Sequence, residues 1–340
     1  MRVLLVLLFL GLNVCPSSAD DGKENVIMFW NLENFYDYTD AGTGESDTEF
    51  SPDGKRRWTS RRFYDKCRLI AKAIFWVGDR CGRIPDVIGV AEVENRSVLS
   101  RLLSSTGLRK HDYKVVHQES GDRRRIDVAL MYRSDVFEIV SSSHVTPFYD
   151  GIRMPTRDIL CVKLRRKSDG RVFDYVVNHH PSKFGGSKES DKRREVVMRT
   201  LRSVCDSLCE ASSSLPGYGG IIAMGDFNGT PDAAQFSLLD GALENACYEL
   251  YRKGEGTIRN EGKWDLIDMF WVSPAVAGES RAEILQIPFL MTRERKHPGE
   301  KPLRTYYGPR YLGGVSDHCP IILKLRKTCG RWSRSINVIS

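Results

Sequence analysis

Short apolar runs rich in β-branched and aromatic residues recur along the whole chain. Runs of this kind are typical of strands that are buried on both faces of a sheet. The predicted strands are Val26–Trp30, Asp86–Val93, Ile126–Tyr132, Ile159–Leu164, Val172–Val177, Gly220–Met224, Leu266–Val272 and Pro320–Leu325.

Elsewhere the apolar residues recur every three or four positions, as they do on the buried face of an amphipathic helix. The clearest stretch runs over Arg61–Val77, with Ile70 and Ile74 on one face. A second helix is predicted over Ser187–Ala211, and a third, shorter one over Ser97–Leu103.

Strands interleaved with helices predict a layered α/β or α+β domain. Strands that follow each other without a helix, such as Ile126–Tyr132 and Phe137–Val140, are expected to pair antiparallel, so the sheet content is mixed. No Pro-, Ser- or Gly-rich linker divides the chain, which predicts a single domain over residues 20–340.

Three polar stretches are long enough to be loops with a role of their own. They are Tyr38–Trp58, Gly254–Lys263 and Thr292–Gly314. In a compact domain, loops of this length are typical of binding rims or mobile flaps.

The N-terminus has the pattern of a secretory signal peptide. Arg2 is followed by an apolar run from Val3 to Leu12, and the small residues Ser17-Ser18-Ala19 offer a cleavage site. The apolar run is too short to span a bilayer. Residues 1–19 are therefore predicted to be removed, and the mature protein is expected to be secreted or periplasmic.

Composition adds two expectations to this picture. The formal net charge of +7 would fall by one with the loss of Arg2, and a mild positive excess suits an anionic partner without identifying one. An even number of cysteines remains after the predicted cleavage, and in an oxidising compartment some of them are expected to pair. Their spacing is not that of a zinc knuckle.

Polar residues stand where the predicted strands begin or end. They are Asn31, Glu92, Asn178, His179, Asp226, Asn228, Asp268, Asp317 and His318. Each one alone has a simple structural explanation, such as an Asx-turn or a satisfied buried group. Together they are harder to explain structurally, because a core does not gather desolvated carboxylates without a compensating cation.

The mixture of donors indicates which cation this is. Many hard oxygen ligands, with histidine as the only nitrogen donor and no thiolate group, favour Mg²⁺ or Mn²⁺, with Ca²⁺ as a further candidate, over Zn²⁺. Phosphoryl chemistry needs such a cation, a base for water and a donor for the developing charge. The sequence therefore predicts a metal-dependent phosphodiester hydrolase.

These residues also carry a resemblance to a known family. The ordered series is Asn31, Glu92, Asn178-His179, Gly225-Asp226-Phe227-Asn228, Asp268 and Ser316-Asp317-His318. It resembles the endonuclease/exonuclease/phosphatase superfamily, in its deoxyribonuclease I-like and exonuclease III-like form and of a secreted bacterial type. The resemblance covers about residues 25–326. It implies an α+β fold, a four-layer α/β/β/α sandwich of two packed mixed β-sheets, with the active site at one edge.

The same resemblance implies roles for single residues. Glu92 would be the main metal ligand, with Asn31 and Asp317 nearby. Asp226 would orient or deprotonate the attacking water, and Asn228 would hold the phosphate.

Further roles follow for the histidines. His318, oriented by Asp268, would stabilise the charge of the phosphorane. His179 resembles a second active-site histidine, with Asp127 as its candidate partner. His180 stands where relatives of this type often carry tryptophan, which puts in doubt any inference about substrate contacts beside His179.

Substrate contacts are expected from several other residues. Asn178 belongs to the family series, and Arg157 resembles a phosphate-contacting arginine at the start of a strand. The run Arg123, Arg124 and Arg125 is either an ordinary solvated surface or a rim that tracks phosphates without sequence preference.

Three functions are compatible with these residues. The first is a secreted endonuclease of low sequence specificity that cleaves DNA or RNA by activated-water attack, as a monomer with no stable protein partner. The second is a phosphatase or phosphodiesterase acting on a small phosphoester such as an inositol phosphate or sphingomyelin. Lys263–Asp268 differs from the segment typical of the inositol-phosphatase branch, which argues against that branch only. The third, a non-catalytic binding module on the same fold, is disfavoured because the acidic residues are retained.

Overall fold

The computed structural model describes residues 24–39, 45–182 and 187–326, so the predicted signal peptide lies outside it. The first of two large sheets contains β1 (Glu24–Phe35), β2 (Val87–Val93), β3 (Tyr113–His117), β4 (Asp127–Arg133), β15 (Ser280–Ile284) and β20 (Ile321–Arg326). The second contains β5 (Phe137–Val145), β8 (Ile159–Arg166), β9 (Val172–His179), β10 (Tyr218–Asp226), β11 (Glu244–Asn245) and β14 (Asp268–Val272). Their orders are β15-β20-β1-β2-β4-β3 and β11-β14-β10-β9-β8-β5.

Both sheets are mixed, as the sequence predicts. β1 pairs parallel with β2, and β9 pairs parallel with β10, while the other neighbours in each sheet pair antiparallel. The expected pairing of Ile126–Tyr132 with Phe137–Val140 is wrong, because these segments lie in different sheets. β4 is hydrogen-bonded by β2 and by β3 on its two sides, so it has no edge left for β5.

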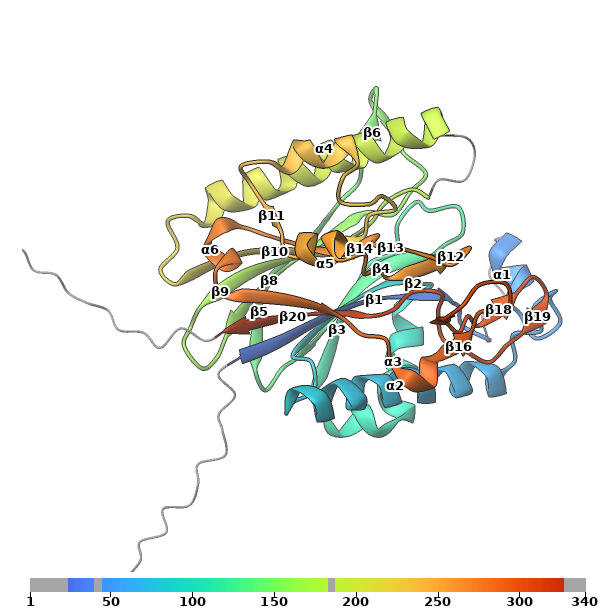
Figure 1. The fold of residues 1–340 in the computed structure, drawn as a ribbon. Helices are drawn as coiled ribbons and strands as arrows, with labels where there is room; N and C mark the ends of the chain where they lie inside the picture. Colours follow the sequence, from blue (N-terminus) through green and yellow to red (C-terminus); the bar gives the residue numbers. More distant parts are fainter. Residues whose placement is uncertain (1–23, 40–44, 183–186, 327–340) are drawn as a thin grey trace, which may run out of the picture.

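The two sheets pack face to face between layers of helices (Figure 1). Alternate residues of β1 show the arrangement, since Ile27 and Phe29 belong to the core between the sheets. Met28 and Trp30 instead pack towards the helices α2 (Ser60–Cys81) and α3 (Arg96–Ser105). The long helix α4 (Ser187–Ser212) covers the outer face of the second sheet. The predicted four-layer α/β/β/α sandwich is therefore confirmed.

The three predicted helices are present with nearly the predicted bounds. α2 ends where Gly82 takes the left-handed conformation, with φ of 73°. α3 begins after Asn95, whose side chain accepts a hydrogen bond from the Val98 amide at 3.0 Å. No helix in the described ranges combines the length and the apolar character needed to cross a bilayer.

Short elements occur in the connections between the main strands and helices, including the three long polar stretches. The helical pieces are α1 (Glu45–Glu49), α5 (Tyr248–Arg252) and α6 (Pro274–Ala277). The two-stranded pieces are β6 (Phe148–Tyr149) with β7 (Ile152–Arg153), β12 (Ile258–Asn260) with β13 (Lys263–Asp265), β16 (Met291–Arg293) with β17 (Glu300–Pro302), and β18 (Tyr306–Tyr307) with β19 (Arg310–Tyr311).

Among the described residues, the expected disulfide pairing is not seen. All seven cysteines within the described part of the chain are free. Most of them are buried in the apolar layers, and burial raises the pKa of the Cys247 thiol to about 12. Cys329 lies outside the described residues.

Candidate active site

Adjacent strands of the second sheet bring three predicted residues into line. In the β9–β10–β14 register, His179 stands opposite Asp226, and Asp226 stands opposite Asp268. Residues directly opposite each other in a sheet are close enough for their side chains to interact. Gly225 makes this close packing possible, because a Cβ atom there would lie 2.1 Å from the Asn178 carbonyl oxygen.

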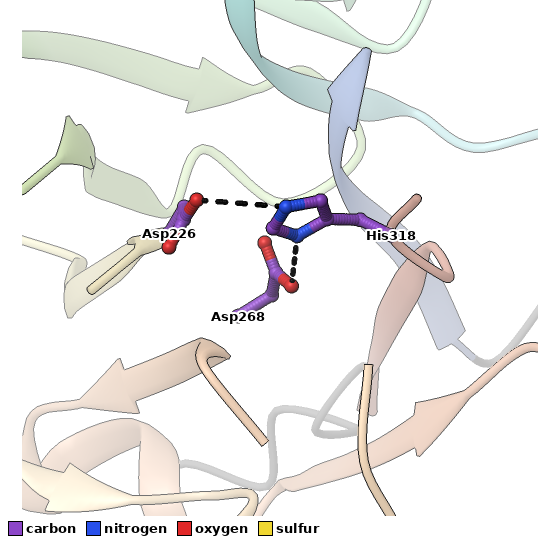
Figure 2. Close-up of side chains that lie close together, drawn as sticks. All are labelled: Asp226, Asp268 and His318. Carbon is purple, nitrogen blue, oxygen red and sulfur yellow. Dashed lines mark hydrogen bonds and ion pairs between the residues drawn. The ribbon is translucent and has the colours of Figure 1, made fainter. Parts of the chain in front are cut away.

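His318 joins this group from the first sheet, since it lies in the segment just before β20 (Figure 2). Its Nδ1 lies 2.7 Å from Oδ2 of Asp268, which is a hydrogen bond, and its Nε2 lies 3.9 Å from Oδ2 of Asp226. All three side chains are buried or nearly so. The His318–Asp268 contact therefore links the two sheets at the site.

The surroundings set the charges of this group. Burial opposes a charge on His318, but the charge and hydrogen bond of Asp268, together with the charges of Asp226 and Asp317, outweigh it and hold the pKa of His318 well above its ordinary value. Burial, reinforced by the negative charge of Asp268, raises the pKa of Asp226 to about 7. At neutral pH the site therefore holds a charged histidine beside a carboxylate that is poised to exchange a proton.

His179 is a histidine of the opposite kind. Its Nε2 lies 3.5 Å from Oδ2 of Asp226, and its buried Nδ1 has no hydrogen-bond partner within the described residues. Burial, together with the charges of Arg157 and Arg124, holds the pKa of His179 well below its ordinary value. His179 is therefore neutral.

The predicted pairing of Asp127 with His179 is not what the structure shows. The Asp127 carboxylate accepts hydrogen bonds from the Ser120 hydroxyl and, at 3.1 Å, from the Ser120 amide. Its other oxygen lies 3.6 Å from Nε2 of His117. Asp127 thus shapes the loop that precedes β4.

The predicted metal ligands lie beside this group. Asn31 donates from Nδ2 to Oδ2 of Asp226 at 3.1 Å, and its Oδ1 accepts from the Glu33 amide at 2.9 Å. Oε2 of Glu92 accepts from the Asn34 amide at 2.8 Å.

Asp317 completes the predicted ligand set from the segment before β20. Its Oδ1 lies 3.8 Å from Nε2 of His318. The side chains of Glu92 and Asp317 keep 12% and 34% of their surface exposed, so both remain open to solvent.

The backbone that carries these ligands is strained. Glu33, Asn34 and Glu92 have φ values of 46°, 52° and 60°, in the left-handed region that favours glycine. Such strain persists only where the surrounding structure holds it, and it is common at functional sites.

A buried cluster that the sequence analysis missed supports this strained turn. Lys66 is 1% exposed and donates from Nζ to the Glu33 carbonyl at 2.6 Å and to the Thr305 hydroxyl at 2.8 Å. The Glu33 carboxylate accepts from Nε of Arg304 at 2.9 Å, and Nη2 of Arg304 lies 3.1 Å from Asp317. Burial, followed by the charge of Asp317, raises the pKa of Glu33 to about 7.

Part of this cluster left a signal in the sequence. Lys66 falls between Phe63 and Ile70 on the apolar face of α2, where a lysine is unusual and calls for a buried partner. Arg304 lies in a long polar loop, where nothing in the pattern distinguishes it from a solvated arginine.

Two groups of side chains are candidates for holding a cation. The ligand atoms of Asp226, Asp268 and His318 lie within 4.8 Å of one another. A charged His318 bonded to Asp268 would repel a cation, however, so we favour the second group, Glu92, Asn31 and Asp317. These are hard oxygen donors, and the side chains of Glu92 and Asp317 keep part of their surface exposed.

Two residues expected to contact substrate are buried instead. Asn178 has no exposed surface, and its Nδ2 donates to the Met224 carbonyl at 3.0 Å. Arg157 is 6% exposed, and its guanidinium donates at 2.9 Å both to Asp122 and to the His180 carbonyl. Both side chains therefore support the site from inside the fold.

His180 is also part of this interior. Its ring lies 5.1 Å from that of Phe227, and neither ring nitrogen has a partner in the described part of the chain. Burial, followed by the charge of Arg157, lowers the pKa of His180 to about 3. His180 thus fills its place as a neutral, packed ring.

Two predicted substrate-binding positions do lie at the surface of the site. Nη2 of Arg124 lies 3.7 Å from Oε1 of Glu92, whereas Arg123 and Arg125 are exposed. Asn228 is half-buried, and its amide donates to Oδ1 of Asp226 at 2.9 Å while its Nδ2 donates to the His180 carbonyl at 2.9 Å. Of the three arginines, Arg124 is the one that approaches the predicted metal ligands.

Comparison with solved structures identifies proteins with the same fold. A mannosyl-6-phosphatase from Bacteroides thetaiotaomicron is 17% identical, with 88% of this chain and 99% of that chain covered and a TM-score of 0.56. The human Nocturnin catalytic domain with a bound sulfate anion is 16% identical, with 89% and 94% covered and a TM-score of 0.54. D. rerio TDP2 complexed with a single-strand DNA product is 14% identical, with 88% and 98% covered and a TM-score of 0.51.

The sequence itself carries a family signature over most of its length. No curated protein matches it significantly. The profile of the Endonuclease/Exonuclease/phosphatase family matches residues 26–327, which is nearly the whole of the described chain. The strand-end carboxylates and histidines thus stand on a chain that belongs to the endonuclease/exonuclease/phosphatase family of phosphoester hydrolases.

Proposed function

We propose that this protein is a divalent-metal-dependent phosphodiesterase that cleaves DNA or RNA internally and with little sequence preference. The observation that carries the proposal is the placing of Asp226 between a neutral His179 and a charged His318, at 3.5 Å and 3.9 Å. Hydrolysis of a phosphodiester requires a base that activates water and a cationic donor that stabilises the charge on the phosphate. Asp226 and His318 can take these two roles side by side.

In this proposal Asp226 accepts a proton from water while the water oxygen forms a bond to phosphorus. The bond from phosphorus to the leaving oxygen then breaks, that oxygen takes up a proton from solvent, and Asp226 later returns its proton to solvent. His318, kept charged by Asp268, stabilises the negative charge on the phosphorane, and Asn228 positions a phosphate oxygen. A Mg²⁺ or Mn²⁺ ion held by Glu92, Asn31 and Asp317 would neutralise the non-bridging oxygens.

The polynucleotide substrate is supported by charge. The chain carries a formal net charge of +7, and Arg124 and Arg304 lie beside the predicted metal ligands. Positive side chains around a phosphate site give affinity for a nucleic-acid backbone without sequence preference.

The test is turnover by the purified mature protein on plasmid DNA, RNA, a phosphodiester and phosphomonoesters that include mannose 6-phosphate. We expect nicking of the plasmid and cleavage of RNA, or of one of the two. Excess chelator should abolish turnover, and Mg²⁺ or Mn²⁺ should restore it. The variant Asp226→Asn, purified in parallel, shows that the activity belongs to this protein.

Two results would contradict the proposal. Full activity after metal stripping would exclude the metal-dependent mechanism. Hydrolysis of a phosphomonoester alone would favour the second candidate, a phosphatase acting on a small molecule.

We also propose that the protein is exported, because residues 1–19 have the pattern of a signal peptide. The mature chain should then begin near Asp20 and be found outside the cytoplasm. N-terminal sequencing that finds Met1 on a cytoplasmic species would contradict this.

A further inference from the structure

A pocket of about 170 Å³ opens beside the candidate active site, between the end of β1 and the β18–β19 hairpin. We call it the hairpin pocket, and its lining includes Glu33, Asn34, Phe50, Arg56, Arg304 and the hairpin residues Tyr306 and Tyr307. Two of them also contact the predicted metal ligands. The Asn34 amide donates to Glu92, and the Arg304 guanidinium pairs with Asp317. An occupant of this pocket would therefore lie next to the reacting phosphate.

Aromatic rings and a guanidinium form a rigid side of the hairpin pocket. The rings of Phe50 and Tyr306 meet edge to face, with centroids 5.9 Å apart. The guanidinium of Arg56 lies 5.5 Å from the Phe50 ring and 5.4 Å from the Tyr306 ring, and Glu49 fixes it at 2.7 Å. These contacts hold the pocket in shape before any ligand enters.

Tyr307 stands at the mouth of the hairpin pocket with its ring uncovered. Side chains alternate along β18, so Tyr306 is 5% exposed while Tyr307 is 71% exposed. An exposed ring at the edge of a pocket is a surface on which a planar group can stack.

Arg304 adds a positive charge that is already oriented. Its side chain is 44% exposed, and two carboxylates, Glu33 and Asp317, hold it at 2.9 Å and 3.1 Å. An arginine held in this way loses little conformational entropy when it binds an anion. The hairpin pocket thus presents a stacking surface and a cationic group in the same lining.

We infer that the hairpin pocket binds the nucleotide adjacent to the scissile phosphate, with Tyr307 stacking on its base and Arg304 facing its phosphate. The small volume suits a single base, since pockets for larger ligands span roughly 300–1,000 Å³. This inference rests on the proposed polynucleotide substrate and names the subsite that holds it.

The test compares Tyr307→Ala and Tyr307→Trp with the wild type on a short oligonucleotide that has one cleavable linkage, the others being methylphosphonates. Tyr307→Ala should raise KM about tenfold with little change in kcat, because stacking on an aromatic side chain contributes to binding each base. Tyr307→Trp should stay near the wild type. Tyr248→Ala removes another exposed tyrosine, 45% exposed on α5, and should have no effect.

A second substrate locates the base. In it, one nucleotide flanking the cleavable linkage is abasic, first on the 5′ side and then on the 3′ side. One of these two abasic substrates should bind the wild type more weakly than the intact oligonucleotide does. The loss of affinity should equal the loss that Tyr307→Ala causes on the intact oligonucleotide. Tyr307→Ala should then cause almost no additional loss on that substrate.

The outcomes separate this inference from the function on which it rests. Cleavage of the oligonucleotide with equal KM for Tyr307→Ala and Tyr248→Ala would overturn the subsite and leave the nuclease proposal standing. Equal losses in Tyr307→Ala and Tyr307→Trp would also overturn it, since they would indicate a structural role. If the wild type cleaves no polynucleotide at all, the proposed function fails and the nucleotide subsite fails with it.

Discussion

At the scale of single residues, Asp226 shows how surroundings change the chemistry of one carboxyl group. Its ordinary pKa is 3.8, and burial in the fold, with Asp268 beside it, raises the pKa to about 7. A general base works best when its pKa lies near the working pH. The environment that makes Asp226 useful therefore also makes its ionised form costly to bury.

This cost gives a prediction for stability against pH. Because the folded pKa of Asp226 is raised, the folded chain keeps a proton that the unfolded chain releases between about pH 4 and 7, so stability falls as pH rises through that range. Asp226→Asn has no such proton. Between about pH 5 and pH 8, the variant should gain roughly 2–3 kcal/mol relative to the wild type. Urea unfolding of both proteins in chelator measures this, and a constant difference would contradict it.

His318 and Asp268 give a prediction for catalysis. If His318 stabilises charge that develops in the transition state, His318→Ala should lower kcat by about 100-fold or more and change KM little. Asp268 acts through His318, to which it is bonded at 2.7 Å, so Asp268→Asn should cost less alone and little more when His318 is already absent. The test is a double-mutant cycle in which kcat and KM are measured for folded wild type, both single variants and the double variant. Additive losses would show that the two residues do not work as a unit.

Single residues also show where sequence reasoning succeeds and where it ends. Asp226, Asp268 and His318 could be predicted because strand ends concentrate at one edge of a sandwich, and the structure brings them together. The hydrogen bonds of Asp127 to Ser120 and of Arg304 to Glu33 could not be predicted. They depend on the exact path of loops, which the hydrophobic pattern does not encode.

At the scale of elements, the close approach of β9 and β10 explains Gly225. Its missing Cβ leaves room for the Asn178 carbonyl, and any Cβ would lie only 2.1 Å from that oxygen. Gly225→Ala must therefore push the strands apart at the position where His179 and Asp226 face each other.

We expect Gly225→Ala to lower the free energy of unfolding by about 3 kcal/mol or more and to reduce kcat as well. Gly278→Ala is the matched control. Gly278 has φ of −68° and no atom within 4 Å of the added Cβ, so its replacement should be nearly neutral. Chemical denaturation and kinetics of the two variants test this, and equal stabilities would refute the packing argument.

Element prediction from the sequence worked best where burial is complete. Strands such as β2 and β9 and helices such as α2 were found because their apolar patterns are long and regular. The prediction that β4 and β5 pair was wrong. Two strands that are adjacent in the sequence can lie in different sheets when other strands already pair with both sides of the first one. The β18–β19 hairpin was predicted as a loop, since its two-residue strands carry no periodic signal.

At the scale of the whole molecule, the positive charge predicts how binding responds to salt. Arg124 lies beside Glu92, whereas the neighbouring Arg123 is exposed to solvent. Arg124→Ala should raise KM for a polynucleotide and reduce the slope of log affinity against log salt by about one unit. Arg123→Ala should change both far less. Titration of substrate binding at several salt concentrations measures the slopes, and equal slopes would reject a special role for Arg124.

The hydrogen bond from Asn31 on β1 to Asp226 on β10 joins the two sheets at the site, and this has a practical consequence. A cut in the turn between β4 and β5 would give one piece with Asn31, Glu92 and Arg124, and a second with Asp226, Asp268 and His318. The second piece would also carry β20, which pairs with β1 of the first piece. Neither fragment could turn over substrate alone. Fused to two interacting proteins, the halves would act as a split reporter whose signal appears only on reassembly.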